Sequence, residues 1–248
     1  MKAEKIAGGS SIGLFLLACF FMLAPAALAA PAQGETEAAI IGFSPNGKYV
    51  AYEEYGISAV SPEAYSIIRI VNVRKNSFVG KRIVHVVEFE EQLDMDGIRS
   101  EAREKAGILF RRLGISPGER PGREINIMLK KSPNAQGGFR IDFTANKKSY
   151  RLELFERVYQ RKGLCQAQMG DTKMKIFILR VKDRQSGALK ILQKDRKLYK
   201  SRGCVFNYDF TSAYTYRDRL VVFIKAELFN DEGTEIKQLV VTGTLKFK

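Results

Sequence analysis

The chain has 248 residues and a formal net charge of +14 at neutral pH, and 45% of its residues are hydrophobic. This length suffices for one large domain or two small ones. The sequence holds one histidine and three cysteines, which excludes a histidine cluster as a catalytic or metal-binding centre.

The first residues have the layout of an export signal. Two lysines and an apolar run over residues 12–23 precede the small-residue site Ala27-Leu28-Ala29. This pattern is typical of a secretory signal peptide over residues 1–29, cleaved between Ala29 and Ala30. We therefore expect a periplasmic or secreted protein.

Two alternatives to a cleaved signal peptide stay open. A transmembrane anchor is one, although the apolar run is shorter than the ~20 residues that span a membrane. A lipoprotein is the other, because Leu16-Leu17-Ala18-Cys19 resembles a lipobox. The apolar run continues beyond Cys19, which disfavours lipid attachment there.

Two cysteines, Cys165 and Cys204, remain after the leader. An even number of cysteines in an oxidising compartment favours one disulfide over two buried free thiols. In the chain-entropy interpretation, closing a loop of this length contributes roughly 3–4 kcal/mol of stability.

The excess of lysine and arginine indicates either a well-solvated surface or an anionic partner. Export argues against nucleic acid, and no aromatic-plus-basic motif of an RNA or DNA module is present. The anionic candidates are therefore envelope components, either lipid or glycan. No glycine-rich phosphate loop is present, and we expect no cofactor.

Beyond a disordered lead-in over residues 30–37, residues 38–248 are predicted to form a single β-rich domain. The fold class is mainly β, with ten or more short antiparallel strands in a sandwich-like or propeller-like arrangement and one amphipathic helix. The strands are predicted over residues 39–44, 48–55, 65–73, 83–89, 125–129, 139–145, 150–158, 174–181, 188–193, 205–210, 220–229 and 236–247.

A hairpin opens this domain. Two apolar runs flank Pro45-Asn46-Gly47, in which proline sets φ while asparagine and glycine tolerate positive φ. The turn is therefore predicted to need a positive φ at Gly47.

The helix is predicted over residues 97–113, because apolar residues recur on one face from Ile98 to Leu113. Asp94 or Asp96 can cap its start, and Gly114 stands where a left-handed C′ residue belongs. The outer face carries cationic side chains that either contact an anionic surface or are simply solvated, and the candidates are Arg99, Arg103, Arg111 and Arg112.

Two resemblances follow from these motifs. The segment from Phe43 to Tyr52 resembles one blade of a TolB-type β-propeller, but the chain lacks the repeats that a propeller needs. The same opening segment, ending in Glu53-Glu54-Tyr55-Gly56, together with Ser201-Arg202-Gly203-Cys204, resembles an uncharacterised bacterial family of predicted secreted proteins. This resemblance implies export and supplies no activity.

The residues Glu53, Glu54 and Tyr55 are the candidates for ligand binding. Adjacent strand residues point to opposite faces, so without a bulge the two glutamates cannot act together as a catalytic pair, whereas either one could pair with a distant carboxylate. Tyr55 with Tyr49, Tyr52 and Tyr65 forms either an aromatic binding platform or ordinary strand packing.

We predict no catalytic residue and no metal ligand. His85 lies in the middle of a predicted strand, where a structural role is expected. The acidic run over residues 88–97 fails the calcium-loop pattern at both ends and is interpreted as helix capping.

Two functional hypotheses remain. The first is an exported, non-enzymatic binding or interaction protein. The second is an envelope polysaccharide or peptidoglycan hydrolase that uses carboxylates, which requires two of them in one cleft.

Overall fold

The computed structural model describes residues 36–58, 63–88, 94–127, 131–133, 138–159, 165, 173–199, 202–230 and 233–247. The chain forms three antiparallel sheets of five, five and four strands, together with one long helix, α1 (Met95–Leu113). The prediction of a mainly β fold with one helix is confirmed. The predicted leader over residues 1–29 lies outside the described residues.

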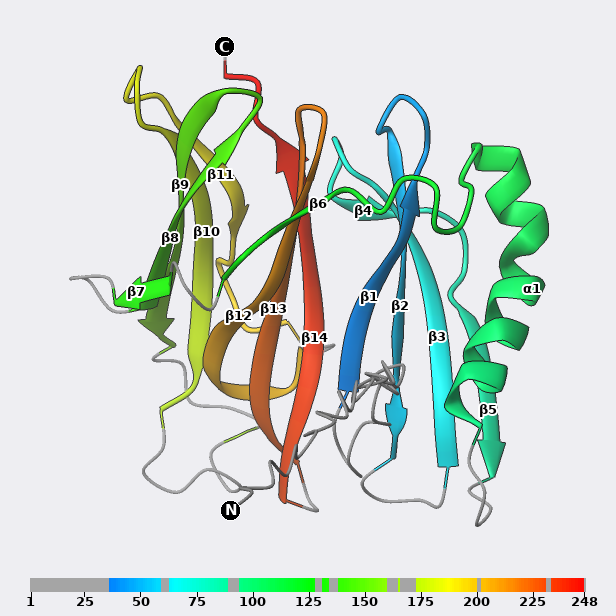
Figure 1. Cartoon of the computed structure of the whole chain (residues 1–248). Coiled ribbons are helices and arrows are strands. Elements are labelled where there is room, and N and C mark those ends of the chain that lie inside the picture. Colours follow the sequence, from blue (N-terminus) through cyan, green and yellow to red (C-terminus); the bar gives the residue numbers. More distant parts are fainter. Residues whose placement is uncertain are drawn as a thin grey trace, which may run out of the picture.

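The N-terminal sheet contains β1 to β5 and is covered by α1 (Figure 1). Its strand order is β1-β2-β3-β4, and β5 also pairs with β3. The bounds are β1 (Thr36–Phe43), β2 (Tyr49–Ile57), β3 (Glu63–Asn72), β4 (Ser77–Phe78) and β5 (Ile83–Glu88).

The remaining strands form a central sheet and an outer sheet. The central sheet has the order β14-β13-β12-β6, and the outer sheet has the order β11-β10-β9-β8-β7. The bounds are β6 (Arg123–Ile125), β7 (Lys131–Pro133), β8 (Gly138–Ala145), β9 (Lys148–Val158), β10 (Lys175–Asp183), β11 (Leu189–Lys194), β12 (Cys204–Tyr216), β13 (Arg219–Asn230) and β14 (Gly233–Thr244).

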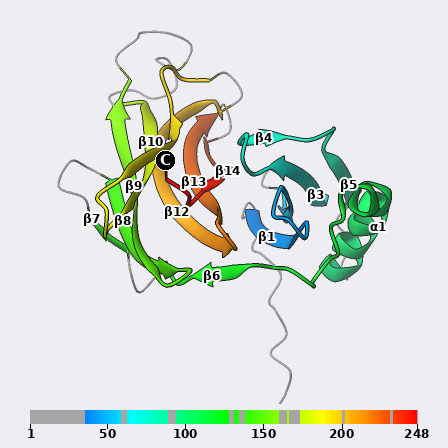
Figure 2. The same ribbon diagram turned by 90° about the horizontal axis from the view of Figure 1, so that it is seen from above.

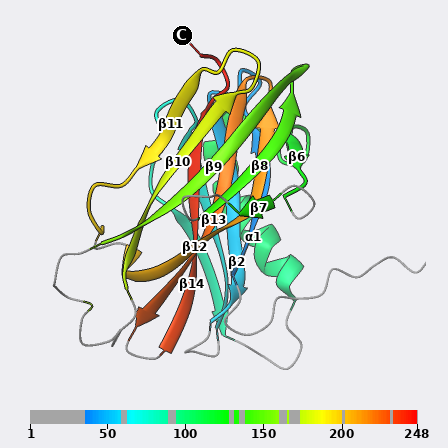
Figure 3. The same ribbon diagram turned by 90° about the vertical axis from the view of Figure 1, so that its left-hand side faces the viewer.

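The sheets and the helix stack as layers, in the order outer sheet, central sheet, N-terminal sheet and α1 (Figures 1 and 2). Seen from the side of the outer sheet, β8 to β11 cross in front of the central sheet (Figure 3). Of the two arrangements left open by the sequence, the layers match a sandwich, extended by a third sheet, and not the radiating blades of a propeller.

The central sheet buries both of its faces. On β13, Leu220, Val222 and Ile224 pack in the core shared with the outer sheet, whereas Val221 and Phe223 pack against the N-terminal sheet. All five side chains are fully buried. A strand covered on both faces needs such an unbroken apolar run.

The opening hairpin joins β1 to β2 as predicted. The Gly47 amide donates to the Ser44 carbonyl oxygen at 2.8 Å, and Gly47 has φ of +65°. The Asn46 side chain accepts a hydrogen bond from the Lys48 amide at 2.9 Å. The prediction that this turn needs a positive φ at Gly47 is therefore confirmed.

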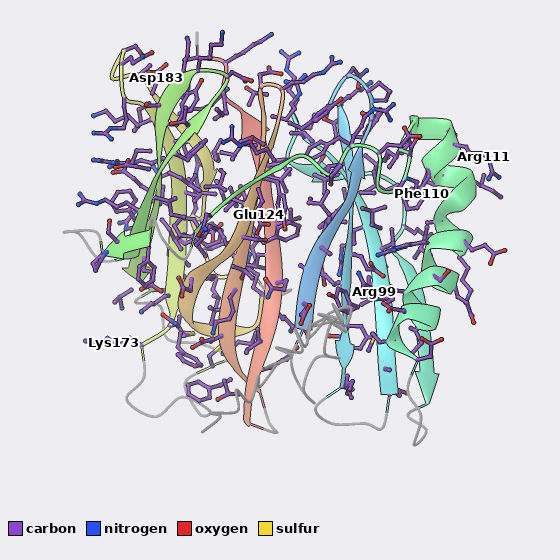
Figure 4. The ribbon with its side chains drawn as sticks, viewed as in Figure 1. Arg99, Phe110, Arg111, Glu124, Lys173 and Asp183 are labelled. Carbon is purple, nitrogen blue, oxygen red and sulfur yellow. A yellow bond between two sulfur atoms is a disulfide. The ribbon has the colours of Figure 1, made fainter. Side chains whose placement is uncertain are left out.

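The helix α1 also confirms its prediction. The Asp94 carboxylate caps the start by accepting from the Gly97 amide at 2.9 Å, and Gly114 ends the helix at φ of 68°. Ala102, Ala106 and Phe110 are buried against the N-terminal sheet. Figure 4 shows Phe110 pointing toward that sheet.

Several strand predictions differ from the structure. The sixth strand occupies Arg123–Ile125 instead of residues 125–129, and β12 continues to Tyr216, well past the predicted end at residue 210. The short strands β4 and β7 were not predicted, because two or three residues carry no readable period. Strand β1 begins at Thr36, inside the predicted lead-in over residues 30–37.

Candidate functional site

The neighbouring residues Glu53 and Glu54 lie on opposite faces of β2, as strand geometry requires. Glu53 faces α1, and Glu54 lines a groove between the N-terminal and central sheets. The two carboxylates therefore lie in separate environments, one beneath α1 and one in the groove.

Glu53 is fully buried and makes three charge-assisted or polar contacts. The Ser66 hydroxyl donates to one carboxylate oxygen at 2.9 Å, while Arg99 Nε and Arg103 Nη2 donate to the other at 3.2 and 2.6 Å. We call Glu53, Ser66, Arg99 and Arg103 the Glu53 cluster. Because a buried carboxylate is costly unless it is paired, this cluster ties α1 to the N-terminal sheet.

Tyr55 extends the Glu53 cluster. The Arg99 guanidinium lies 3.9 Å from the centroid of the Tyr55 ring, and the Tyr55 hydroxyl donates to Glu37 at 2.5 Å. Burial, followed by the hydrogen bond to Glu37, raises the pKa of Tyr55 to about 12. Tyr55 and Glu53, both predicted as ligand-binding candidates, are thus engaged in contacts within the fold.

The four arginines predicted as anionic-surface contacts divide into two pairs. Arg99 and Arg103 direct their guanidinium groups at Glu53. Arg111 and Arg112 are exposed on the last turn of α1, and Figure 4 shows Arg111 pointing away from the sheets. Contact of Arg111 and Arg112 with an anionic surface stays a prediction.

The groove on the other face of β2 has a volume of about 800 Å³. We call it the inter-sheet groove. One wall comes from β1 to β4 and Arg82, the second from β14, and the third from the segment between β11 and β12. Its aromatic, charged and amide-bearing lining residues include Tyr52, Glu54, Tyr65, Arg69, Phe78, Arg82, Gln193, Tyr199, Arg202, Glu235 and Lys237.

Glu54 is the most perturbed carboxyl group in this groove. Burial raises its pKa above the ordinary value of 4.5, and the positive charges of Arg69 and Arg82 and a hydrogen bond from Tyr52 partly oppose that rise. Arg69 Nε lies 3.2 Å from Glu54 Oε1. The Glu54 carboxyl therefore holds its proton to a higher pH than an exposed glutamate does.

The wall between β11 and β12 is organised around Arg202. Its guanidinium pairs with the buried carboxylate of Asp195 and lies 5.1 Å from the ring centroid of Tyr199. Asp195 also accepts a hydrogen bond from Gln193 at 2.8 Å. These contacts hold three groove-lining side chains in place before any ligand arrives.

The predicted disulfide between Cys165 and Cys204 is confirmed, with a Cα–Cα distance of 5.5 Å. Cys204 begins β12 and lies two residues beyond Arg202. The disulfide therefore anchors the end of the segment that forms this wall.

The four-tyrosine platform considered from the sequence is split by strand alternation. Tyr52 and Tyr65 line the inter-sheet groove, whereas Tyr49 packs beside the core under α1 and Tyr55 joins the Glu53 cluster. The sequence missed Phe78 and Tyr199, which are 57% and 37% exposed and supply the other two rings of the groove. No local pattern marks either residue.

Metal binding gains no support in the described ranges, where no three histidine, cysteine, aspartate or glutamate side chains gather. Asp94, at the end of the acidic run, serves as a helix cap. The side chain of His85 and residues 89–93 of the run lie outside the described part of the chain. Within the same described ranges, no helix is both long and apolar enough to cross a membrane.

Comparisons with known proteins give one family. No curated protein and no solved structure matches the chain. A family model described as "Predicted secreted protein (DUF2259)" matches residues 51–244, which include most of β2, all of α1, the disulfide and nearly all of the inter-sheet groove. That match covers well over half of the sequence, so the chain belongs to this family of predicted secreted proteins.

Proposed function

We propose that the protein is an exported, non-enzymatic binding protein whose ligand lies in the inter-sheet groove. The volume of about 800 Å³ falls in the range of ordinary ligand sites, roughly 300–1,000 Å³. The groove combines aromatic surface with a few placed polar groups, which is the usual composition of such sites. Family membership supports export.

The side chains of the groove suit an acidic glycan. The rings of Tyr65, Phe78 and Tyr199 offer flat apolar surface for sugar rings. Arginine guanidinium groups bind carboxylates in a bidentate manner, and arginine and lysine outnumber acidic side chains along the groove. This ligand class agrees with the anionic envelope glycan considered from the sequence.

The main support for an acidic ligand is the side chain of Arg82. It lines the groove and lowers the pKa of Glu54 by its charge, yet its side chain forms no ion pair with any described residue. Arg69 and Arg202, by contrast, already face Glu54 and Asp195. An acidic ligand supplies the missing partner for Arg82.

Isothermal titration calorimetry with galacturonic-acid oligosaccharides and neutral galactose oligosaccharides tests this proposal. We expect the acidic series alone to bind, and Arg82→Ala to weaken binding about tenfold, the effect of losing one charge-assisted hydrogen bond. Arg111→Ala is the matched control, because it removes an exposed arginine far from the groove. Equal affinity for both series, or equal loss in both variants, would contradict an acidic-glycan site.

A hydrolase is the second candidate function, and one observation favours it. Glu54 and Glu235 both line the groove, and both carboxylates raise the pKa of Tyr65, after the larger effect of burial. A carboxyl with a raised pKa next to a second carboxylate is the arrangement that glycoside hydrolysis uses. Mass spectrometry of the same oligosaccharides after incubation decides: cleavage that Glu54→Gln abolishes would replace the binding role with a hydrolytic one.

The route of export has its own test. Mass spectrometry of the protein from the host envelope is expected to show a chain that begins at Ala30, the product of signal-peptide cleavage. A chain that begins at a lipid-modified Cys19 would instead make the protein an anchored lipoprotein.

A further inference from the structure

A second pocket adjoins the inter-sheet groove, toward the end of the molecule where the C-terminus emerges (Figure 1). We call it the turn pocket. It has a volume of about 820 Å³ and is formed by the β3–β4 turn, strand β11, the β12–β13 turn, and the end of β14 with the residues that follow it. All three sheets therefore contribute to it.

The turn pocket is strongly cationic. The charged side chains that line it are basic with one exception, Asp218, and the basic ones are Arg74, Lys75, Lys190, Arg219 and Lys246. Asp218 is already engaged by Arg219 at 3.0 Å and Lys246 at 3.7 Å. The side chains of Arg74 and Lys75 are exposed and form no ion pair with the described residues. Among the described residues, the side chains that line the pocket therefore carry a net positive charge.

Hydrogen bonds hold the walls of the turn pocket in a set geometry. Asn76, in the β3–β4 turn, accepts from the Thr242 amide at 2.8 Å and donates to Gln193 at 3.2 Å. The Thr242 hydroxyl donates to the Val73 carbonyl oxygen at 2.9 Å. The turn that carries Arg74 and Lys75 is therefore fastened to β14, so these cations are presented by a rigid frame.

The opposite side is equally ordered. Lys190 Nζ donates to the Thr244 hydroxyl at 2.6 Å and to the Lys246 carbonyl oxygen at 2.8 Å. Arg219 Nε donates to the Gly47 carbonyl oxygen at 3.1 Å. Cations held in this way lose little conformational freedom when an anion arrives, which favours binding.

We propose that the turn pocket binds phosphomonoester groups. A phosphomonoester carries about −1.5 to −2 charges at neutral pH and three strong acceptor oxygens, so several lysine and arginine donors can share one group. A single carboxylate offers less charge to balance the same cluster. Leu189 and Ile191, which also line the pocket, are 49% and 51% exposed and place apolar surface beside the cations.

Two sources of this chemistry fit the pocket: a soluble phosphorylated sugar and the head group of an anionic lipid. The apolar surface of Leu189 and Ile191 suits the second. The proposal concerns the phosphomonoester itself and stands independently of the ligand in the inter-sheet groove.

The test measures binding of the full mature protein to three probes. Calorimetry uses glucose 1-phosphate and inorganic pyrophosphate, and a flotation assay uses phosphatidylcholine vesicles with and without phosphatidic acid. We expect saturable binding to glucose 1-phosphate or to the phosphatidic acid vesicles, the two probes that carry a phosphomonoester, and pyrophosphate serves as the anionic comparison. Binding of glucose 1-phosphate alone identifies a soluble source, and binding of phosphatidic acid vesicles identifies a lipid source.

The double variant Arg74→Ala/Lys75→Ala should weaken that binding by about tenfold or more, because it removes two charge-assisted contacts. Both side chains are exposed and unpaired in the described part of the chain, so the fold should survive the change. Arg111→Ala/Arg112→Ala is the matched control, since it removes the same charge from another exposed pair. This control should change affinity less than about twofold.

Three results would overturn the proposal. The first is the absence of binding to both phosphomonoester probes, glucose 1-phosphate and the phosphatidic acid vesicles, whatever the result with pyrophosphate. The second is an equal loss of affinity in both double variants, which would show unspecific attraction to a basic protein. The third is loss of vesicle binding in the helix variant alone, which would assign the anionic contact to α1.

Discussion

Glu53 and Glu54 are neighbours of the same chemical type, yet the two faces of β2 give them opposite surroundings. Glu53 is closed in by two arginines and a serine beneath α1. Glu54 lines the inter-sheet groove beside Arg69, whose Nε lies 3.2 Å from the carboxylate, and burial raises its pKa. The same residue type therefore ties α1 to the sheet on one face of the strand and lines the inter-sheet groove on the other.

The difference comes from how completely each charge is compensated. The Glu53 carboxylate accepts from three donors, so most of its hydrogen-bonding capacity is used within the fold. At Glu54 burial outweighs the neighbouring positive charges, so the pKa of this carboxyl is raised. Removal of the two carboxylates is therefore expected to have unequal consequences for stability.

Removing the Glu53 carboxylate should be the most damaging change. In Glu53→Ala the guanidinium groups of Arg99 and Arg103 lose their partner beneath α1. We expect the free energy of unfolding to fall by about 3–5 kcal/mol, the usual result when one member of a buried ion pair is removed. Urea unfolding measures it.

Glu54→Gln is the control for this change, because it keeps the shape of the neighbouring side chain in the groove. We expect it to cost about 1 kcal/mol, because the glutamine oxygen can still accept a hydrogen bond from Arg69. Similar losses in the two variants would refute the division between a structural face and a binding face.

Loss of the disulfide should damage the groove face selectively. Replacing Cys165 and Cys204 together with serine should lower the free energy of unfolding by about 3–4 kcal/mol through loss of the loop constraint. It should also weaken ligand binding in the inter-sheet groove, since Arg202 lies two residues from Cys204. Denaturant unfolding and calorimetry measure the two effects, and an unchanged unfolding midpoint would contradict the first.

Disturbing the opening turn should weaken both faces of β2 together. In Gly47→Val the residue must hold a φ of +65°, and its Cβ would lie 2.8 Å from Arg219 Cγ. We expect a loss of about 2–3 kcal/mol, from backbone strain together with overpacking. Thermal unfolding measures it.

Gly118→Val separates these two causes. Gly118 has a similar φ of +77°, but nothing lies within 4 Å of the position that a Cβ would take there. Only the backbone strain of about 1–2 kcal/mol should then remain. If both variants lose the same stability, the contact with Arg219 contributes nothing.

The smallest predicted effect is a pH dependence. Because the folded-state pKa of Glu54 is raised above 4.5, its contribution to stability is present below the unfolded-state pKa and is lost as the pH rises through the folded-state pKa. Glu54→Gln should remove that loss, so its stability relative to the parent should improve from about pH 4 to pH 8.

Glu227 provides a control of opposite sign. Its pKa is lowered, chiefly by a hydrogen bond from Lys225, so its contribution is present above the unfolded-state pKa and is lost as the pH falls. Glu227→Gln should therefore lose stability relative to the parent as the pH rises from the lowered folded-state pKa to just above the unfolded-state pKa of about 4.5, and its relative stability should stay constant at higher pH. Urea unfolding at each pH measures both variants, and slopes of the same sign would contradict the assignment.

Features that depend on local chemistry were predictable from the sequence. The turn at Gly47, the caps of α1 at Asp94 and Gly114, and the pairing of Cys165 with Cys204 all follow from residue type and compartment. The alternation of strand residues also placed Glu53 and Glu54 on opposite faces. Each of these inferences needs only a few neighbouring residues or a count of cysteines.

The sequence of strand β13 indicates its burial as well as its secondary structure. Its unbroken apolar run from Leu220 to Ile224 predicts a strand, and the structure shows that such a run marks a sheet covered on both faces. The short strands β4 and β7 carry no comparable signal, because their length falls below one readable period.

The inter-sheet groove and the turn pocket could not be predicted from the sequence, for a physical reason. Glu54, Phe78 and Tyr199 come from separate parts of the chain, and so do Lys75 and Lys246. Residue type alone cannot show that long-range packing of three sheets brings such groups together.

The sequence by itself determined the export signature, the β-rich class, the long helix and the disulfide, because periodicity, caps and cysteine number are local properties. The tertiary structure decided that the sheets stack in three layers with the central one buried on both faces. It also decided that Glu53 pairs with arginines of α1 whereas Glu54 lines a groove. The physical reason is that the partners that compensate a buried charge come from distant parts of the chain.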